Sequence, residues 1–363
     1  MRYKTIAITI IIALICLSCA KNNIEYNNDT NYQEFTLSEI VHGSTEYLGL
    51  LENNMLIYFS SQDKQLNYYM YNLATQKNVK LGNIKGNYVL VDSAAMLNNK
   101  LYFYVTTILN NGFENILYTV DLQEHKLEQI EHKDNSLYGV YTFSFGEKII
   151  ALKNERYNDT IVTYIDTYSP TIDKWEKYLI NSYNETERKG SALYVCCTEG
   201  EYLYTIEDRY NNKQCKSFLV TYDSDFEEKN SILLSDEVKK FIDENRITEI
   251  RIWNNFFYLK NISNDGFIGY IKDNKKIEKI YSDKQLSISS SANSTDEPIF
   301  YIRDTNTFFT LDIKNQKVLK HYAREPYEFL WIITSSDAAV FDINKNGKGT
   351  QQIYVKRWNL EEI

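Results

Sequence analysis

The sequence predicts an all-β fold, a seven-bladed β-propeller of four-stranded antiparallel blades. Two observations carry this prediction. A short polar turn followed by a strongly apolar β run recurs seven times along the chain, and similar strand-like stretches surround each recurrence. The composition agrees, because 31 tyrosines and 17 phenylalanines against 13 glycines and 3 prolines favour strands over helices.

The repeated turns precede runs such as MLIYF, KLYFYV and FFYLK. The seven turns begin at Asn53, Asn98, Gly146, Gly200, Asn254, Asp296 and Ser336, which gives spacings of 45, 48, 54, 54, 42 and 40 residues. Strand-like runs also precede most turns, a third run follows a polar loop, and a fourth, more polar run usually completes the unit. Four short antiparallel strands at this period are typical of a propeller blade. A ring of six or eight blades, or another all-β fold, is the alternative.

The two ends of the chain are expected to meet. The seventh unit has three clear strands before the chain ends, and an additional strand-like stretch, residues 34–41, precedes the first unit. We expect this N-terminal strand to complete the last blade, so that no sheet edge is left open. Residues 235–242, between units four and five, predict a short amphipathic helix with Ser235 as its N-cap.

The first 18 residues have the pattern of a secretory signal. Arg2 and Lys4 precede an apolar run over residues 6–17, and Ser18 and Cys19 follow. A run of about 12 residues is too short to cross a bilayer, which needs roughly 20. The asparagine-rich segment after it predicts a flexible tether. We therefore expect a signal peptide over residues 1–18, a tether over residues 19–33 and a propeller domain over residues 34–363.

This segment resembles the signal of bacterial lipoproteins, which has an aliphatic residue three positions before the lipidated cysteine and a small residue directly before it. Leu17 and Ser18 fit the last two positions before the cysteine. Cys16, three positions before Cys19, stands where leucine or isoleucine is usual. The resemblance implies a diacylglycerol on Cys19, which would anchor the protein to the outer face of the bacterial cell membrane. Secretion without a lipid, or an uncleaved anchor, is the alternative.

The charge of the domain restricts its partners. Removal of Arg2 and Lys4 with the signal lowers the 40 basic residues to 38, against 49 acidic residues, which gives a net charge of −11. Nucleic acids and anionic headgroups select basic patches. We therefore expect no nucleic-acid partner, membrane attachment through the lipid alone, and a monomer.

The cysteines of the domain do not form a metal-binding motif. Cys196 and Cys197 are neighbours on a predicted strand and point to opposite faces, so they cannot both reach Cys215. Buried free thiols, or one disulfide to Cys215, are the two interpretations. Among these three cysteines, no CxxC or Cys-His spacing indicates zinc.

The sequence contains no motif for catalysis or for a cofactor. The four histidines lie far apart, and HExxH, GxSxG and phosphate-binding glycine loops are absent from the sequence. One stretch matches the first half of a calcium loop, with Asp342, Asn344 and Asn346 on alternate positions, but Ile353 stands where the bidentate glutamate belongs. A hairpin turn is the favoured interpretation, and a weak calcium site is the alternative. We predict no catalytic residue and no cofactor.

One tripeptide occurs in two successive units, in the loop between the second and third strands. Such loops would share one rim of the ring with the connections between blades, and function concentrates on loops. Two arginines and two tyrosines side by side could stack on sugars or grip carboxylates. The candidate ligand-binding residues are Arg156, Tyr157, Asn158, Arg209, Tyr210 and Asn211. Shared repeat ancestry and turn preference are the alternative explanation.

The repeat pattern resembles that of secreted bacterial propeller proteins, including TolB-like and quinoprotein-type propellers and lipoproteins of Gram-positive bacteria. The resemblance covers residues 34–363, and no WD, kelch or quinoprotein signature accompanies it. It implies a fold and an extracellular, membrane-anchored location. We predict a non-catalytic binding module for a protein or glycan ligand. The alternatives are a carbohydrate-active propeller enzyme and an accessory scaffold subunit of an envelope or transport complex.

Overall fold

The computed structural model of the chain consists almost entirely of β-strands. It describes residues 32–36, 44–51, 55–62, 65–72, 75, 77–85, 88–89, 94–109, 112–134, 141–211, 214–244, 247–288, 300–302, 307–312, 314–322, 337–343 and 353–359. Within these ranges the only helix is α2 (Asp236–Glu244). None of the helical segments described is long and apolar enough to cross a membrane.

Most pairings join strands that follow each other along the chain, and each pairing is antiparallel. One sheet contains β2 (Ser44–Leu51), β3 (Met55–Gln62), β4 (Gln65–Asn72) and β5 (Lys77–Lys85). The next contains β6 (Tyr88–Val89), β7 (Ala94–Leu97), β8 (Lys100–Leu109), β9 (Gly112–Asp121) and β10 (Lys126–Asp134). Two later four-stranded sheets contain β19 (Ile247–Trp253), β20 (Phe256–Asn261), β21 (Gly266–Lys272) and β22 (Lys276–Asp283), and β23 (Leu286–Ile288), β24 (Phe300–Ile302), β25 (Thr307–Asp312) and β26 (Lys317–Tyr322).

The longest sheet has eight strands and consists of two halves. The first half is β11 (Tyr141–Phe145), β12 (Lys148–Tyr157), β13 (Thr160–Ser169) and β14 (Lys174–Asn184). The second half is β15 (Lys189–Glu199), β16 (Tyr202–Asn211), β17 (Gln214–Tyr222) and β18 (Glu228–Leu233). Only the end of β14 and the start of β15 join them, through the pairs Tyr183–Gly190 and Asn184–Lys189.

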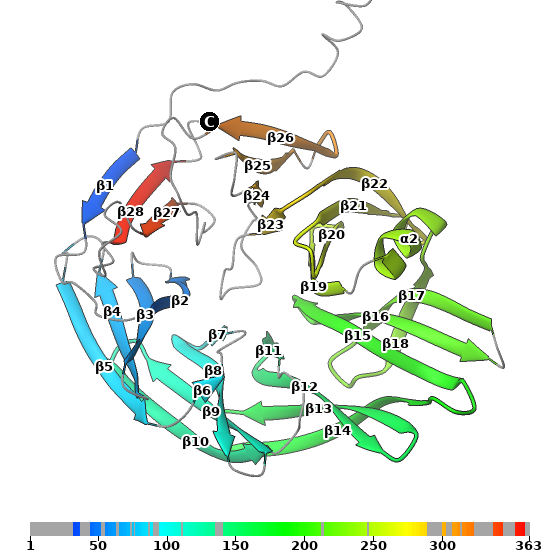
Figure 1. Ribbon diagram of the computed structural model, residues 1–363, viewed down its shortest axis with the longest axis horizontal. Helices are drawn as coiled ribbons and strands as arrows, with labels where there is room; N and C mark the ends of the chain where they lie inside the picture. The colour runs from blue at the N-terminus through cyan, green and yellow to red at the C-terminus, as the bar shows by residue number, and fades with distance from the viewer. Residues whose placement is uncertain are drawn as a thin grey trace, which may run out of the picture.

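The two ends of the described chain meet in one sheet. Strand β1 (Tyr32–Thr36) pairs along its whole length with β28 (Ile353–Asn359), which also pairs with β27 (Asp337–Ile343). The N-terminal strand therefore joins the last strands of the chain, and it begins two residues before the predicted start at residue 34. Figure 1 shows this sheet and the others side by side around a common centre, with β2, β11, β19 and β27 near that centre and β1, β5, β14 and β26 on the periphery.

The predicted turns between first and second strands are confirmed where the structure describes them. Asn98, Gly146, Gly200 and Asn254 have φ values of 52°, 58°, 59° and 47°, the left-handed region that asparagine and glycine tolerate best. The turns predicted at residues 53–54, 296–297 and 336 lie outside the described residues. Local turn chemistry thus fixes where each inner hairpin reverses.

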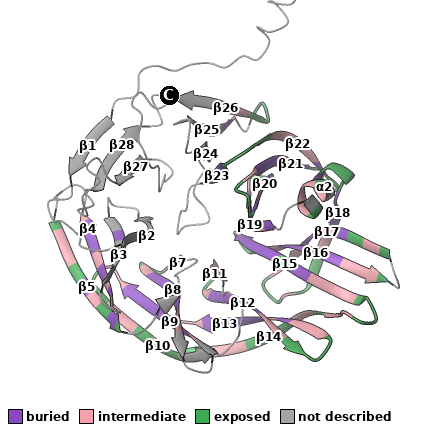
Figure 2. Ribbon diagram, in the orientation of Figure 1, coloured by how far each residue is buried: buried purple, intermediate pink, exposed green. Residues whose placement is uncertain are grey.

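The core consists of apolar layers between neighbouring sheets. Tyr68 of the first sheet stacks on Phe103 of the second, with ring centroids 5.2 Å apart. Aromatic pairs in this geometry contribute about 0.5–1.5 kcal/mol beyond their burial. Figure 2 shows that burial concentrates on the inner and middle strands, whereas every residue of the outer strand β14 is half-buried or exposed. Each sheet therefore depends on its neighbours to cover its two faces.

Helix α2 is the predicted amphipathic helix between units four and five. The Oγ of Ser235 accepts a hydrogen bond from the Val238 amide at 3.4 Å, which satisfies one of the unpaired N–H groups of the first turn. Val238 is buried, and the ring of Phe241 lies 5.7 Å from that of Phe267. The helix covers the core between the eight-stranded sheet and the sheet that begins with β19.

The cysteines are free thiols, so the alternative of a disulfide to Cys215 is wrong. Cys196 and Cys197 are buried and Cys215 is half-buried. Burial raises the pKa of the Cys197 thiol to about 12 and also raises the pKa of the Cys196 thiol well above its usual value. These two thiols are therefore protonated packing residues at neutral pH.

Candidate functional site

The two copies of the tripeptide lie at equivalent places in the two halves of the eight-stranded sheet. Arg156 and Tyr157 end β12, and Asn158 begins the following turn with a φ of 51°. Arg209, Tyr210 and Asn211 end β16. Both copies therefore lie at the ends of their strands, on the same side of the sheet as the turn that connects β14 and β15.

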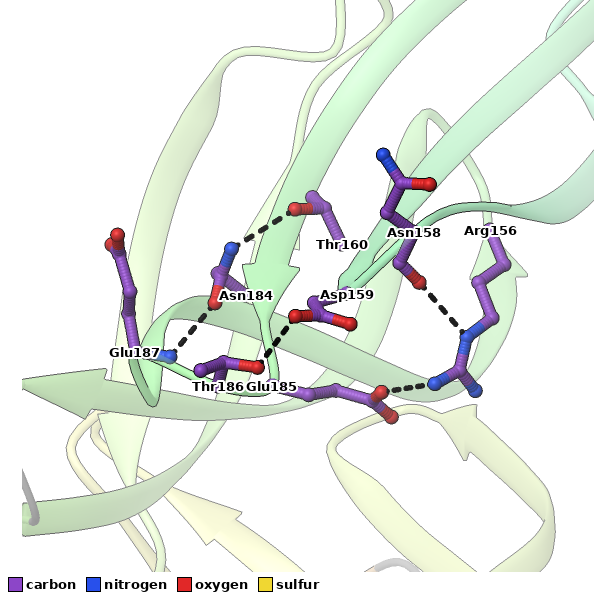
Figure 3. Close-up of polar contacts among 8 residues, drawn as sticks. All are labelled: Arg156, Asn158, Asp159, Thr160, Asn184, Glu185, Thr186 and Glu187. Carbon is purple, nitrogen blue, oxygen red and sulfur yellow. Dashed lines mark hydrogen bonds and ion pairs between the residues drawn. The ribbon is translucent and has the colours of Figure 1, made fainter.

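The first copy fixes that connection in place (Figure 3). Arg156 forms an ion pair with Glu185 and donates a hydrogen bond to the backbone oxygen of Asn158 at 3.2 Å. The Glu185 amide donates to the Asp159 carbonyl at 2.8 Å, and the Thr186 hydroxyl donates to the Asp159 carboxylate at 2.7 Å. The guanidinium of the first copy thus fastens the β14–β15 turn to the β12–β13 turn.

In the second copy, too, carboxylates hold the arginine. Arg209 lies 2.7 Å from Glu228 and 3.8 Å from the buried Glu207, and its guanidinium lies 5.0 Å from the ring centre of Phe218. Each guanidinium therefore has its own glutamate partner. The second copy differs from the first in its tyrosine, because Tyr210 belongs to a cluster of polar aromatic side chains.

This cluster begins with a row of residues directly opposite one another on four adjacent strands. The row runs from Tyr183 on β14 through Gly190 and Tyr210 to Cys215 on β17. Residues opposite each other in antiparallel strands point to the same face. Because Gly190 has no side chain, the rings of Tyr183 and Tyr210 meet above it, with centroids 4.5 Å apart.

Only glycine fits at position 190. Its φ is +107°, and a Cβ atom there would overlap the carbonyl oxygen of Ser182 and lie 3.2 Å from the Cα of Tyr183. The close approach of β14 to β15, and with it the contact between the two rings, therefore depends on this glycine.

A β-bulge adds a third tyrosine to the cluster. The register of β15 against β16 shifts between Leu193 and Val195, which leaves Tyr194 as the extra residue. Its side chain is 44% exposed, and its hydroxyl lies 3.4 Å from the hydroxyl of Tyr210. The bulge thus directs an exposed aromatic side chain towards Tyr210 from the innermost strand of the half-sheet.

A buried carboxylate holds these hydroxyls together. The hydroxyls of Tyr194 and Tyr210 both donate to Oδ2 of Asp208, at 2.8 and 3.3 Å, and the Ser217 hydroxyl donates to Oδ1. Asp208 is only 9% exposed, so its charge is stabilised by these donors rather than by bulk water. We call Tyr183, Tyr194, Asp208 and Tyr210 the tyrosine–aspartate site.

The phenols of this site remain protonated at neutral pH. Burial raises the pKa of Tyr210 to about 12, and burial together with the contacts to Tyr210 and Asp208 raises the pKa of Tyr194 still further. Burial also raises the pKa of the adjacent Cys215 thiol. Neither tyrosine is therefore prepared to act as a base; both are fixed hydrogen-bonding groups.

The remaining candidate residues fall outside this site. Asp342 lies in β27, for which only the backbone is described, and Asn344 and Asn346 lie outside the described residues, as does Cys19. Across the side chains that the structure does describe, no group of three histidine, cysteine or carboxylate residues is arranged to hold a metal ion.

Three solved structures share the architecture of the chain. An oligogalacturonate lyase in complex with manganese covers 93% of this chain and 96% of its own, with a TM-score of 0.55 and 11% identity. The oligogalacturonate lyase of Vibrio parahaemolyticus covers 90% and 96%, with a TM-score of 0.53 and 13% identity. The Swd1 β-propeller domain of Myceliophteria thermophila covers 90% and 100%, with a TM-score of 0.52 and 10% identity.

The fold is a β-propeller. The sheets arranged around a common centre and the likeness over nearly the whole chain agree on this point. At 10–13% identity the likeness shows the propeller fold alone. No protein-family model matches the sequence, and no curated protein matches it.

Of the four residues of the tyrosine–aspartate site, Tyr210 is among the candidates predicted from the sequence, and Tyr183, Tyr194 and Asp208 are not. The repeated tripeptide was the signal for Tyr210. Tyr194 depends on a bulge, and Tyr183 depends on how two strands of different repeat units align; neither feature has a local sequence signature.

Replacement of Gly190 by alanine tests the role of the β14–β15 approach. We expect Gly190→Ala to lower the free energy of unfolding of the propeller by at least about 2 kcal/mol, since backbone strain and overlap with Ser182 add together. Gly146→Ala is the matched control, because Gly146 also has a positive φ but open space around its Cβ position, and it should cost about 1 kcal/mol. Urea unfolding followed by fluorescence measures both; equal losses would contradict the proposed role.

Proposed function

We propose that the protein is a seven-bladed propeller that begins with β1 at Tyr32, extends to residue 363 and works as a non-catalytic binding module. Counting the two halves of the eight-stranded sheet as separate blades supports the number seven, because only two residue pairs join them. The sheet of β27, β28 and β1 is then the last blade, completed by the N-terminal strand. The N-terminal strand then covers the edge of β28 and closes the ring.

The proposed location is the outer face of the bacterial cell membrane. The charge and hydropathy pattern of residues 1–18 supports a signal peptide, and Ser18 before Cys19 supports lipid attachment. The residues between Cys19 and the start of β1 at Tyr32 would then be the tether between the lipid and the propeller. A monomer held in this way presents its rim to ligands outside the cell.

The observation that carries the binding function is the tyrosine–aspartate site. Its exposed Tyr194, half-buried Tyr183 and Tyr210 and fixed carboxylate combine aromatic faces with aligned hydrogen-bonding groups. Aromatic stacking together with a few fixed polar groups suits a ligand that has both apolar faces and hydroxyls, as sugars do. We therefore favour a glycan ligand over a protein partner.

An enzymatic role is the alternative, because two of the similar solved structures are oligogalacturonate lyases. The site described here favours binding instead. Its phenols have raised pKa values, so neither is a base at neutral pH, and both oxygens of the Asp208 carboxylate accept hydrogen bonds from hydroxyl groups of the site. The proposed binding site does not include a metal ion, unlike the manganese complex of the first lyase.

Glycan binding is tested with a panel of tetrasaccharides, measured by calorimetry and by a turnover assay. We expect binding without product formation, and Tyr194→Ala should weaken it at least about tenfold, or about 1.4 kcal/mol. Tyr202→Ala is the matched control, since Tyr202 is 46% exposed at the opposite end of the same half-sheet. Binding that survives Tyr194→Ala would contradict the site, and product formation would support the enzymatic alternative.

The anchor is tested by metabolic labelling with a palmitate analogue in a Gram-positive host. We expect the full-length protein to be labelled and Cys19→Ala to lose the label, because the acylated thiol is the proposed attachment point. Cys215→Ala is the control and should retain the label, because Cys215 lies outside the signal. Label on Cys19→Ala, or none on the wild type, would refute lipid anchoring at this position.

A further inference from the structure

The hydroxyls of the tyrosine–aspartate site have a fixed hydrogen-bond direction. A phenol has one proton, and once this proton is donated the oxygen can only accept. Tyr194 and Tyr210 both direct their protons to Oδ2 of Asp208. Their oxygens therefore offer lone pairs, and not protons, to anything that approaches from solvent.

The charges around the site reinforce this direction. Asp208 supplies a buried negative charge beneath the phenols. Burial raises the pKa of the Cys215 thiol, and Lys239 on α2 lowers it against this effect. Arg209 belongs to the same strand, but its register places it on the other face, with Glu207, and Glu228 holds it. A ligand carboxylate would therefore meet acceptor oxygens above a buried anion.

We propose, on the basis of the proposed binding function, that Asp208 is a specificity-determining residue that makes the site select neutral glycans and reject uronates. Hydroxyl groups of a neutral sugar donate to the two phenol oxygens while a sugar face covers Tyr194. A uronate carboxylate has no proton to donate at neutral pH, so it cannot make the same contacts. The direction of the hydroxyl protons of Tyr194 and Tyr210 thus determines whether the site binds neutral sugars or uronates.

The substitution Asp208→Asn reverses this direction with little change in shape. The asparagine oxygen can still accept from Ser217, and its NH₂ group can donate to the phenol oxygens. The protons of Tyr194 and Tyr210 are then released towards the ligand. The site gains donors for a carboxylate and loses acceptors for sugar hydroxyls.

The experiment compares neutral and acidic tetrasaccharides on the full-length protein by calorimetry. The neutral probes are tetrasaccharides of glucose, galactose, mannose and N-acetylglucosamine, and the acidic probes are those of glucuronic and galacturonic acid. We expect the best neutral probe to bind the wild type at least about tenfold more tightly than either acidic probe. Asp208→Asn should reduce this ratio about tenfold, since each exchanged hydrogen bond changes affinity about threefold to tenfold.

Glu207→Gln is the matched control for charge. Glu207 is the neighbouring buried carboxylate on β16, it accepts hydrogen bonds from Ser191, Thr205 and Tyr222, and its register places it on the opposite face. Its substitution removes the same charge and should leave the ratio of neutral to acidic affinity unchanged. An equal change in both variants would overturn the proposal, because net charge alone would then explain selectivity.

Tyr194→Phe provides a second test that does not depend on how well Asp208→Asn folds. Loss of the hydroxyl should weaken neutral binding about threefold to tenfold and leave acidic binding unchanged. Equal loss for both probes would overturn the proposal. Acidic probes that bind the wild type best and lose binding in Tyr194→Ala would overturn the selectivity while the binding function stands. If no probe depends on Tyr194, both fail.

Discussion

The candidate site depends on the close approach of two backbones at Gly190. Strand β14 ends one half of the eight-stranded sheet and β15 begins the other. The two strands are paired at two positions, Tyr183–Gly190 and Asn184–Lys189. Because Gly190 has no side chain, Tyr183 of one half and Tyr210 of the other can stack above it. The contacts of Arg156 and Asp159 with the β14–β15 turn hold this junction from the side. A contact between two repeat units thus creates a surface that neither unit has alone.

The buried carboxylate of Asp208 determines which hydrogen-bonding groups this surface offers to a ligand. Hydrogen bonds to a charged group contribute about 1.5–3 kcal/mol each, roughly twice the value for neutral pairs. A ligand that required a proton from Tyr194 or Tyr210 would have to compete with such a bond. Ligands that donate hydrogen bonds meet no such cost. The same buried charge therefore orders the tyrosines and restricts what they can recognise.

The sequence could predict the features that local chemistry determines. The positive-φ turns at Asn98 and Gly146 and the helix that begins after Ser235 follow from residues adjacent to each other in the chain. Strand periodicity likewise indicated an all-β ring and an N-terminal strand that pairs with the last sheet. The site was mostly hidden, because Tyr194 is placed by a bulge and Tyr183 by the alignment of two units. Identical tripeptides also acquired different surroundings, which only the packing of neighbouring units decides.

The most direct test of this account is a crystal structure of the protein with the best-binding neutral tetrasaccharide. We expect a sugar ring against Tyr194, with sugar hydroxyls within hydrogen-bond distance of the phenol oxygens of Tyr194 and Tyr210, while both phenols keep their contacts with Asp208. A sugar bound elsewhere on the propeller, or phenols turned away from Asp208 to donate to the ligand, would contradict it.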